Sequence, residues 1–289
     1  MAKKLYVSVN NTAQEVSKMY VSVNGVAKQV KKAYASVNGV ARLVYDSGGG
    51  GLEIVDWGTG TDSQILAMVQ AADRGEIDLT DYWHVGDKRV VQLSAIPATG
   101  VQETHAAQSV TLVLMNAGGK TLATPTESGR TTCSFIFGLE DCLNEFGKLN
   151  NRHTNSGSWP SCLRRPWCNG PFKDAFPPTF ACIFKQFENK TSAGSRSTNI
   201  LTSIDWFAMP SEVEVTGGTG SSFPGEGSIF TWYETASNRI KRVNGITRYY
   251  FTRSPFKSNN SRYVVIRDNG YATYGSPDGQ SGLAPFGVF

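Results

Sequence analysis

The chain has 289 residues, with 28 Lys and Arg against 24 Asp and Glu, and 40% of its residues are hydrophobic. This length allows about two domains with a substantial core. No stretch of 18 apolar residues occurs and no apolar run follows Lys3-Lys4, so we expect neither membrane insertion nor a secretory signal. The net charge is +5 for residues 1–46 and −1 for the remainder. A cationic segment suits an acidic protein surface, and because no nucleic-acid-binding motif occurs we expect no nucleic acid partner.

Residues 6–44 repeat one short unit three times with a period of 14. Asn24-Gly25 and Asn38-Gly39 lie between runs rich in Val, Tyr and Ser, which predicts β-hairpins with two-residue loops. Asn10-Asn11 takes this place in the first copy. The loop length pairs Val23 with Val26 and Val21 with Lys28. The repeated positions are Tyr6, Tyr20 and Tyr34; Val9, Val23 and Val37; Asn10, Asn24 and Asn38; and Ala13, Ala27 and Ala41.

Such hairpins are marginal alone, so residues 1–46 are interpreted as an attachment or assembly arm that stacks, trimerises or docks on a larger body. The alternative is a flexible tail with accidental repeats. The predicted contact residues of the arm are Tyr6, Tyr20, Val23, Val26, Tyr34, Val37 and Val40. Ser47–Gly51 reads as a flexible linker, and residues 52–289 as a separate domain.

The domain begins with helix signals and ends with strand signals. Thr61 and Gln64 predict a capping box before an apolar stripe that ends at Gly75. A second helix is expected across Leu139–Leu149, and a short helix broken at Pro166 across Ser161–Gly170. Residues 180–187 fit either a helix or a strand. Strands are expected at 89–93, 109–115, 133–137, 205–209, 212–215, 249–253, 262–266 and 271–274. Helices before strands, with long loops between, indicate an α+β fold.

Six motifs in order resemble a C-type-lectin-like domain found in bacterial and phage surface proteins. They are Trp57 with the helix ending at Gly75; Tyr82-Trp-His-Val-Gly-Asp87; Trp159 with Ser161–Arg165 and Trp167-Cys-Asn169; Asp205–Glu212; Tyr250-Phe-Thr-Arg-Ser-Pro255; and Gly282–Phe286. Pro166 interrupts the third motif and Ala284 stands where arginine is usual. The repeats of the arm also resemble those of phage virion proteins, so the resemblance implies a phage structural protein, made in the host cytoplasm and located in the virion.

The sequence shows little that points to catalysis. His84, His105 and His153 have no partner at metal-ligand spacing, and His84 is expected to be structural. The carboxylate pairs Glu140-Asp141 and Glu212/Glu214 are interpreted as a helix start and the solvent face of a strand. A glycosidase needs two carboxylates across a cleft, which the sequence neither excludes nor favours.

The lectin-like fold also hosts formylglycine-generating oxidases, which need a late cysteine pair, but the last cysteine here is Cys182. No calcium-dependent sugar-binding signature of animal lectins occurs either. We therefore expect no enzyme, no metal and no cofactor. The five cysteines are expected to be buried and reduced, with a disulfide or metal site at Cys162 and Cys168 as the alternative.

The region Tyr249–Tyr274 is rich in Tyr, Asn and Arg, which is typical of recognition surfaces and of side chains that stack on sugars. We predict ligand binding by Phe256, Lys257, Asn259, Asn260, Arg262, Tyr271 and Tyr274. The expected function is that of an oligomeric, possibly trimeric, virion protein that is anchored to the capsid or tail by its arm. Its head would bind a bacterial surface glycan or protein. The alternatives are a decoration protein without a receptor and an envelope-degrading enzyme.

Overall fold

The computed structural model describes residues 6–9, 12–15, 19–23, 26–30, 32–37, 40–46, 52–101 and 104–289. The chain divides into two compact units, Met1–Glu53 and Ile54–Phe289. The predicted linker Ser47–Gly51 lies outside the described residues, as do the turn pairs Asn10-Asn11, Asn24-Gly25 and Asn38-Gly39.

The first unit contains three antiparallel strand pairs, β1–β2, β3–β4 and β5–β6. In the second pair Val23 lies opposite Val26 and Val21 opposite Lys28. The seven predicted contact residues of the arm all belong to these strands, and an attachment role for them stays a prediction. The strands are β1 (Tyr6–Val9), β2 (Thr12–Glu15), β3 (Met19–Val23), β4 (Val26–Val30), β5 (Lys32–Val37) and β6 (Val40–Asp46).

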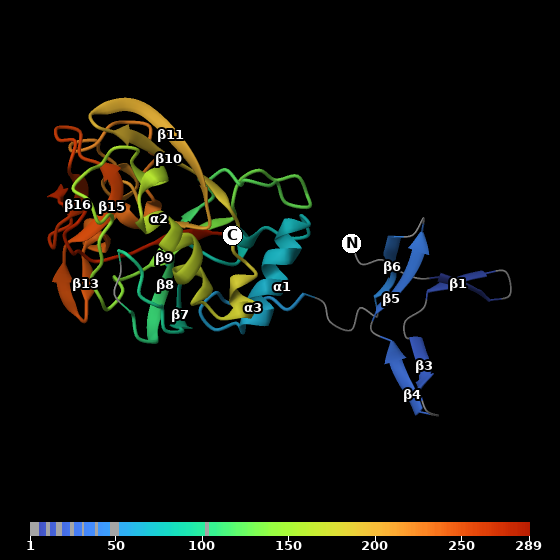
Figure 1. Ribbon diagram of the computed structural model, residues 1–289. Coiled ribbons are helices and arrows are strands. Elements are labelled where there is room, and N and C mark those ends of the chain that lie inside the picture. Colours follow the sequence, from blue (N-terminus) through green and yellow to red (C-terminus); the bar gives the residue numbers. More distant parts are fainter. Residues whose placement is uncertain are drawn as a thin grey trace. The chain divides into compact units, whose positions relative to one another are not determined.

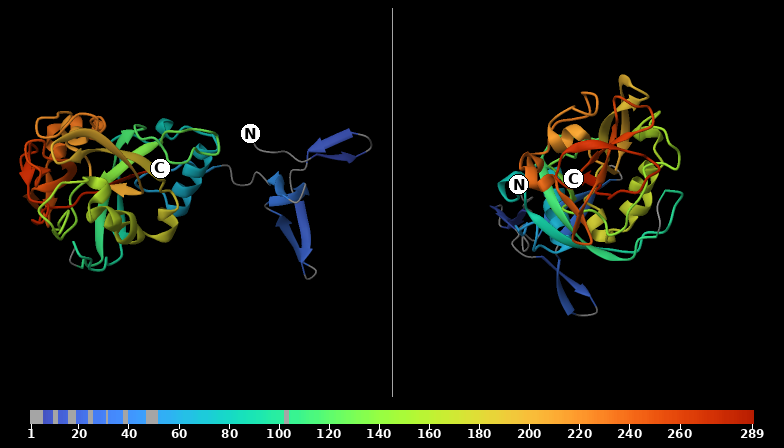
Figure 2. Two further views of the ribbon diagram at one scale, coloured as in Figure 1. Left: turned by 45° about the horizontal axis from the view of Figure 1, so that its top comes forward. Right: turned by 90° about the vertical axis from the view of Figure 1, so that its left-hand side faces the viewer.

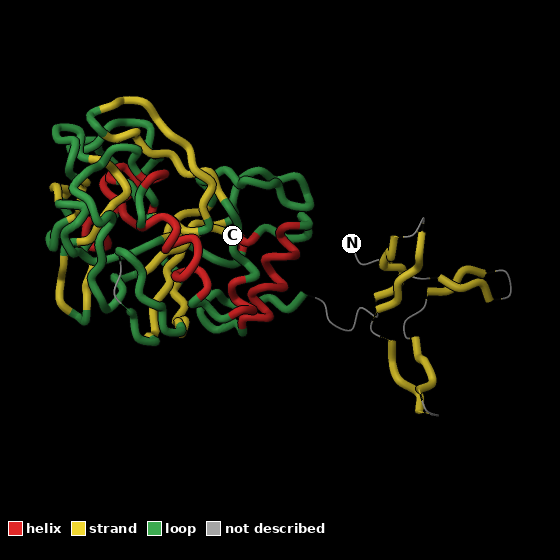
Figure 3. Tube along the Cα trace, in the orientation of Figure 1, coloured by secondary structure: helices red, strands yellow, loops and turns green. Residues whose placement is uncertain are grey.

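The second unit, called the body below, combines short helices with antiparallel sheets, which confirms the α+β class (Figure 3). Its helices are α1 (Asp62–Asp73), η1 (Leu79–Asp81), η2 (Trp159–Ser161), α2 (Arg164–Trp167), the π-helix η3 (Cys168–Phe172), α3 (Pro178–Ala181), α4 (Glu212–Thr216), α5 (Thr231–Glu234) and η4 (Ala236–Arg239). Its strands are β7 (Lys88–Leu93), β8 (Gln108–Ala117), β9 (Phe135–Leu139), β10 (Phe187–Gly194), β11 (Ser197–Asp205), β12 (Phe207–Ala208), β13 (Lys241–Val243), β14 (Ile246–Arg248), β15 (Tyr250–Pro255), β16 (Tyr263–Ile266), β17 (Ala272–Gly275) and β18 (Phe286–Val288).

A five-stranded sheet in the order β12-β18-β9-β8-β7 forms the centre of the body, with the last strand of the chain, β18, inside it. Helix α1 packs against α3 at one end (Figure 1). The three-stranded sheet β15-β16-β17 lies at the opposite end of the body, as Figure 1 and the left view of Figure 2 show. The β10–β11 hairpin arches between these ends, above the central sheet in Figure 1.

Helix α1 begins and ends where the sequence predicts. Thr61 N donates to Gln64 Oε1 at 2.7 Å and Gln64 N donates to Thr61 Oγ1 at 3.3 Å, so the capping box is confirmed. Gly75 follows the helix with a φ of +74°, which a residue with a side chain rarely adopts. The helix buries Ile65, Met68 and Val69, its predicted apolar stripe.

The predicted helix across Leu139–Leu149 is wrong. The leucines at 139, 143 and 149 are buried, as an amphipathic helix would require. The backbone N–H groups, however, bond to distant segments: Glu140 N donates to Thr111 O at 2.8 Å, and Leu143 N to Leu283 O at 3.0 Å. Tertiary hydrogen bonds therefore replace the helical ones. Glu140-Asp141 is not a helix start.

The predicted strand at Glu212–Val215 is also wrong, because these residues form α4. Ser211 caps this helix, and its backbone N donates to Glu214 Oε2 at 2.8 Å, which completes a capping box. The alternation of Glu and Val in the sequence suggests a strand instead. Pro166 does not break its helix either. It lies in the first turn of α2, where a missing N–H costs no intrahelical bond, and the chain continues into η3.

The six resemblance motifs supply the core rather than the surface. Trp57 and Trp83 pack together with ring centroids 5.4 Å apart, and Phe289 stacks on Trp57 at 5.3 Å. The largest fully buried side chains include Trp57, Trp83, Trp159, Trp167, Arg164 and Arg253, all of which belong to those motifs. The motifs therefore report mainly on how the body is packed.

Candidate functional site

The seven predicted ligand-binding residues belong to the sheet β15-β16-β17 and to the turns at the two ends of β16. This sheet lies at one end of the body (Figure 1). Residues 256–262 precede β16 on the side of Tyr274, whereas Tyr271 follows β16 and lies at its other end. Phe256 and Tyr274 are in contact, with ring centroids 4.8 Å apart. Tyr271 and Tyr274 are 69% and 56% exposed, the two most exposed aromatic side chains of residues 52–101 and 104–289. We call Phe256, Tyr271 and Tyr274 the aromatic surface, and residues 256–262, which contain the other four predicted residues, the recognition loop.

The recognition loop is held in place from beneath by one buried side chain, Asn155. Its amide nitrogen donates to Asn259 O at 2.8 Å and to Arg262 O at 2.7 Å, and its backbone N donates to Asn260 O at 3.0 Å. Its Oδ1 accepts a bond from Ser195 N at 2.8 Å. Asn155 is fully buried, so these bonds do not compete with water. The loop therefore has a fixed path before any ligand arrives.

The hairpin next to Asn155 leaves no room for a larger residue at Gly194. A Cβ there would lie 1.8 Å from Asn155 O, and the φ of Gly194 is +74°. The requirement for glycine is thus both steric and conformational. This contact brings the β10–β11 turn to the recognition loop, across about 65 residues of sequence that give no local signal for it.

Two of the predicted residues are used partly within the protein. Lys257 Nζ donates to Thr219 O at 2.8 Å, and Lys257 N donates to Ser221 O at 2.8 Å. Asn259 Oδ1 accepts bonds from Ser261 N at 2.8 Å and Ser261 Oγ at 2.7 Å. These two side chains shape the loop, which leaves the exposed tyrosines as the main contact area.

A polar cluster near this end of the body was not predicted. Ser276 Oγ lies 2.8 Å from His153 Nδ1, and Asp278 Oδ1 lies 3.3 Å from the same nitrogen. Ser276 also donates directly to Asp278. In a nucleophilic triad the serine and the carboxylate occupy opposite ring nitrogens of the histidine, so this geometry does not build one. The Ser276 hydrogen bond lowers the pKa of Asp278.

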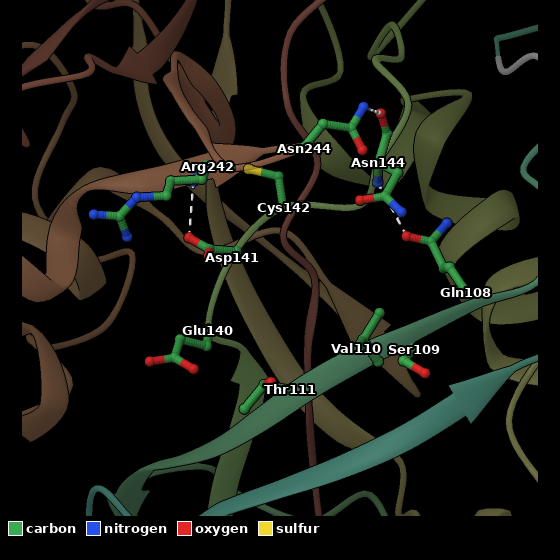
Figure 4. Close-up of a pocket in the computed structure, with 11 residues that line it drawn as sticks. Gln108, Ser109, Val110, Thr111, Glu140, Asp141, Cys142, Asn144, Arg242 and Asn244 are labelled. Atoms are coloured by element: carbon green, nitrogen blue, oxygen red, sulfur yellow. Dashed lines mark hydrogen bonds between the residues drawn. The ribbon is translucent and has the colours of Figure 1, made fainter.

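A separate polar groove of about 190 Å³ runs beside β8 (Figure 4). Asp141 Oδ1 accepts a bond from Arg242 N at 2.8 Å, and Asn244 donates to Asn144 O at 3.0 Å. Its lining residues are Gln108, Ser109, Val110, Thr111, Glu140, Asp141, Cys142, Asn144, Arg242, Asn244 and Gly245. None of the seven predicted ligand-binding residues belongs to this groove.

The groups around the groove have structural partners. Glu140 Oε1 lies 2.5 Å from Lys88 Nζ, so this carboxylate is paired. Burial raises the pKa of Cys142 to about 12, and its thiol is therefore protonated and a poor nucleophile at neutral pH. Beneath the groove, buried Lys241 donates to Leu139 O and Glu140 O, and burial lowers its pKa to about 8.

The carboxylate pair Glu212/Glu214, predicted to face solvent, is buried. Glu214 accepts bonds from Lys120 Nζ at 2.5 Å and from Arg253 Nη1 and Nη2 at 2.5 and 2.8 Å. Burial favours the protonated form of Glu214, but the charges of Arg253 and Lys120 outweigh it and lower the pKa to about 2. We call Lys120, Glu214 and Arg253 the Glu214 cluster. It joins β15, α4 and the segment after β8.

The cysteines and histidines differ in burial. Cys133, Cys142, Cys162 and Cys168 are buried and free, whereas Cys182 is exposed, against the expectation for that residue. No three His, Cys, Asp or Glu side chains converge as a metal site would require within the part of the chain that the structure describes. His84 is exposed and His105 is fully buried. In residues 52–101 and 104–289 and the described strands of the first unit, no helix is long and apolar enough to cross a membrane.

One family matches the sequence. Its description is "domain of unknown function (DUF6273)", and the match covers residues 136–286, more than half of the chain. The chain belongs to the DUF6273 family. The DUF6273 match runs from β9 to β18 and includes Asn155, the aromatic surface and the recognition loop, whereas α1 and the first unit lie outside it. No curated protein and no solved structure is significantly similar to the chain.

Proposed function

We propose that this protein is a phage virion component whose body binds a bacterial surface glycan or protein through the aromatic surface and the recognition loop. The observation that carries the proposal is the exposed Tyr274 in contact with Phe256 of a loop that Asn155 holds in a fixed conformation, with the exposed Tyr271 on the same sheet. A preorganised surface loses little conformational entropy on binding. Tyrosine rings offer apolar area with a hydrogen-bonding tip, which suits stacking on a sugar ring.

The proposal assigns the first unit to anchoring. Its three strand pairs share a 14-residue period, and residues 1–46 have a net charge of +5 against −1 for the remainder. Anchoring of several copies on one particle would convert weak binding by each body into firm adhesion. The resemblance of these repeats to those of phage virion proteins is the second reason for this assignment.

The binding test uses the full chain and purified bacterial cell wall in a sedimentation assay. We expect the double variant Tyr271→Ala/Tyr274→Ala to lose most of the bound fraction while its unfolding midpoint stays unchanged. Tyr82→Ala is the matched control, because Tyr82 is also an exposed tyrosine and lies just after η1, at the α1 end of the body. Binding that survives the double variant would refute the assigned surface. A wild-type protein that assembles into particles but binds no wall would favour a decoration protein.

The anchoring test deletes residues 1–46. We expect the truncated protein to keep the near-ultraviolet circular dichroism of the body but to be absent from purified particles. Incorporation at the wild-type level would defeat the anchoring assignment, and it would leave the wall-binding assignment to be judged by the sedimentation assay alone.

A further inference from the structure

A second pocket, of about 280 Å³, opens beside α2 and has an apolar lining. Val101 and Trp167 are buried and form its base, whereas Leu163 is 40% exposed and lies at its rim. The complete lining is Thr99, Gly100, Val101, Leu163, Pro166, Trp167 and Pro171. The pocket is therefore reachable from solvent and offers an apolar surface to whatever enters it.

A buried arginine lies directly behind this lining. Arg164 is fully buried, and its guanidinium carbon is 4.5 Å from the centroid of the Trp167 ring. Its Nη2 donates to Val101 O at 2.7 Å and to Lys148 O at 2.6 Å, and its Nε donates to Lys148 O at 2.8 Å. All of these acceptors are neutral carbonyls, and no carboxylate pairs with Arg164 among the described residues. The positive charge is thus buried without a counter-ion, which is costly.

Two hydrogen-bond donors beside the pocket have no acceptor. Arg164 Nη1 and Trp167 Nε1 are buried and have no hydrogen-bond partner. The His105 ring lies 5.9 Å from the Trp167 ring, but its Nδ1 is 2.5 Å from Glu145 Oε2, so Nδ1 carries the proton and Nε2 of the neutral ring is an acceptor. Buried donors normally have partners, so two unpaired donors on neighbouring side chains mark a place where an acceptor is missing.

These features select one class of ligand. An apolar compound would cover the pocket lining but leave the charge of Arg164 uncompensated, and a small inorganic ion would leave the lining exposed. In surroundings of low dielectric constant, the guanidinium favours an anion even through the Trp167 ring. Arg164 is not part of the lining and its Nη1 has no contact with solvent, so Arg164 acts on the pocket through its charge.

We propose that this pocket binds a small organic anion, an apolar body that carries one carboxylate or sulfonate group, with Arg164 supplying the counter-charge. The site is separate from the aromatic surface and does not depend on the function proposed above. It lies within the segment that matches the DUF6273 family.

The test compares two probes that share one ring system on the full-length protein. 8-Anilino-1-naphthalenesulfonate carries the anionic group, and N-phenyl-1-naphthylamine lacks it. We expect the sulfonate to bind about tenfold more tightly, or about 1.4 kcal/mol, because the charge of Arg164 attracts the anion across surroundings of low dielectric constant. The readout is the dissociation constant from fluorescence titration. Equal dissociation constants for the two probes would overturn the assignment of Arg164.

Two variants locate the binding. Leu163→Trp fills the rim of the pocket and should weaken both probes about tenfold, whereas the control Ile246→Trp, at a 54% exposed position of β14, should change neither. Arg164→Met should remove the preference for the sulfonate. If Arg164→Met does not fold, the Leu163→Trp result still decides, because binding that this variant leaves unchanged would place the probes elsewhere and refute the pocket.

Discussion

Arg164 and Arg253 are both fully buried and both belong to sequence motifs, but their surroundings differ. Arg253 makes two bonds to Glu214 and further bonds to the carbonyls of Met209, Lys190 and Glu226. Arg164 has only the carbonyls of Val101 and Lys148 and keeps one unpaired nitrogen. Burial of an arginine therefore does not by itself define its role. An arginine whose nitrogens all have partners, as in Arg253, forms a structural ion pair. An arginine with an unpaired nitrogen and no carboxylate, as in Arg164, indicates a ligand site.

The largest expected effect tests the complete site. Glu214→Gln leaves Lys120 and Arg253 buried without a full counter-charge, so we expect a loss of about 3–5 kcal/mol in the free energy of unfolding. Urea denaturation followed by tryptophan fluorescence measures it. The control is Glu234→Gln on the exposed surface, which should change stability by less than about 0.5 kcal/mol. A small effect of Glu214→Gln would show that Arg253, like Arg164, is tolerated in the interior without a carboxylate partner.

The acid limb of the stability curve gives the second test. The folded-state pKa of Glu214, about 2, lies below its usual value of 4.5. A lowered folded pKa means that the contribution is complete above pH 4.5 and is lost as the pH falls towards 2. The contribution is about 3 kcal/mol. We therefore expect the gap between wild type and Glu214→Gln to close over this interval. A gap that stays constant from pH 5 to pH 2.5 would contradict the low pKa.

The third test compares the arginines directly. Arg253→Met leaves Glu214 with Lys120 alone and should cost about 3–5 kcal/mol. Arg164→Met removes a charge that has no carboxylate partner, and it should cost only about 1–2 kcal/mol for the lost carbonyl bonds. Paired denaturation curves in one buffer measure the difference. Equal costs would mean that Arg164 has a counter-charge after all.

The smallest test concerns unpaired buried atoms as such. The hydroxyl of Tyr263 is buried without a partner, whereas the hydroxyl of Tyr250 donates to Arg239 O at 3.0 Å. Tyr263→Phe should be neutral or stabilise the protein by up to about 1 kcal/mol, and Tyr250→Phe should destabilise it by about 1 kcal/mol. If Tyr263→Phe destabilises the protein as much as Tyr250→Phe does, a donor without a visible partner is not evidence of a missing acceptor. The argument from the unpaired donors around Trp167 would then fail.

Local signals predicted α1 and most strands of the body correctly. The capping box at Thr61 and the apolar stripe of α1 depend only on neighbours within one or two turns. The predictions for residues 139–149 and 212–215 are wrong for different reasons. The backbone N–H groups of the first segment bond to distant carbonyls instead of forming a helix, and a capping box at Ser211 makes the second segment a helix instead of a strand. Sequence periodicity carries no information about such acceptors.

The candidate site shows the same limit. Composition alone drew attention to Tyr271 and Tyr274, because exposed tyrosines near loops are typical of recognition surfaces. Asn155 was missed, since its bonds reach Asn259 and Arg262 across more than 100 residues. Arg164 was noticed only as part of a motif, and its missing counter-ion is visible only in three dimensions.

The bonds that Asn155 makes to the recognition loop end on main-chain oxygens, not on side chains. Every amino acid supplies that oxygen, so the trace of the loop is largely indifferent to which residues it displays at 260 and 262. Substitutions at these two positions can change the ligand preference of the surface without changing the backbone of the loop. An asparagine out of reach of solvent would thus let related chains diversify their targets at little cost in stability.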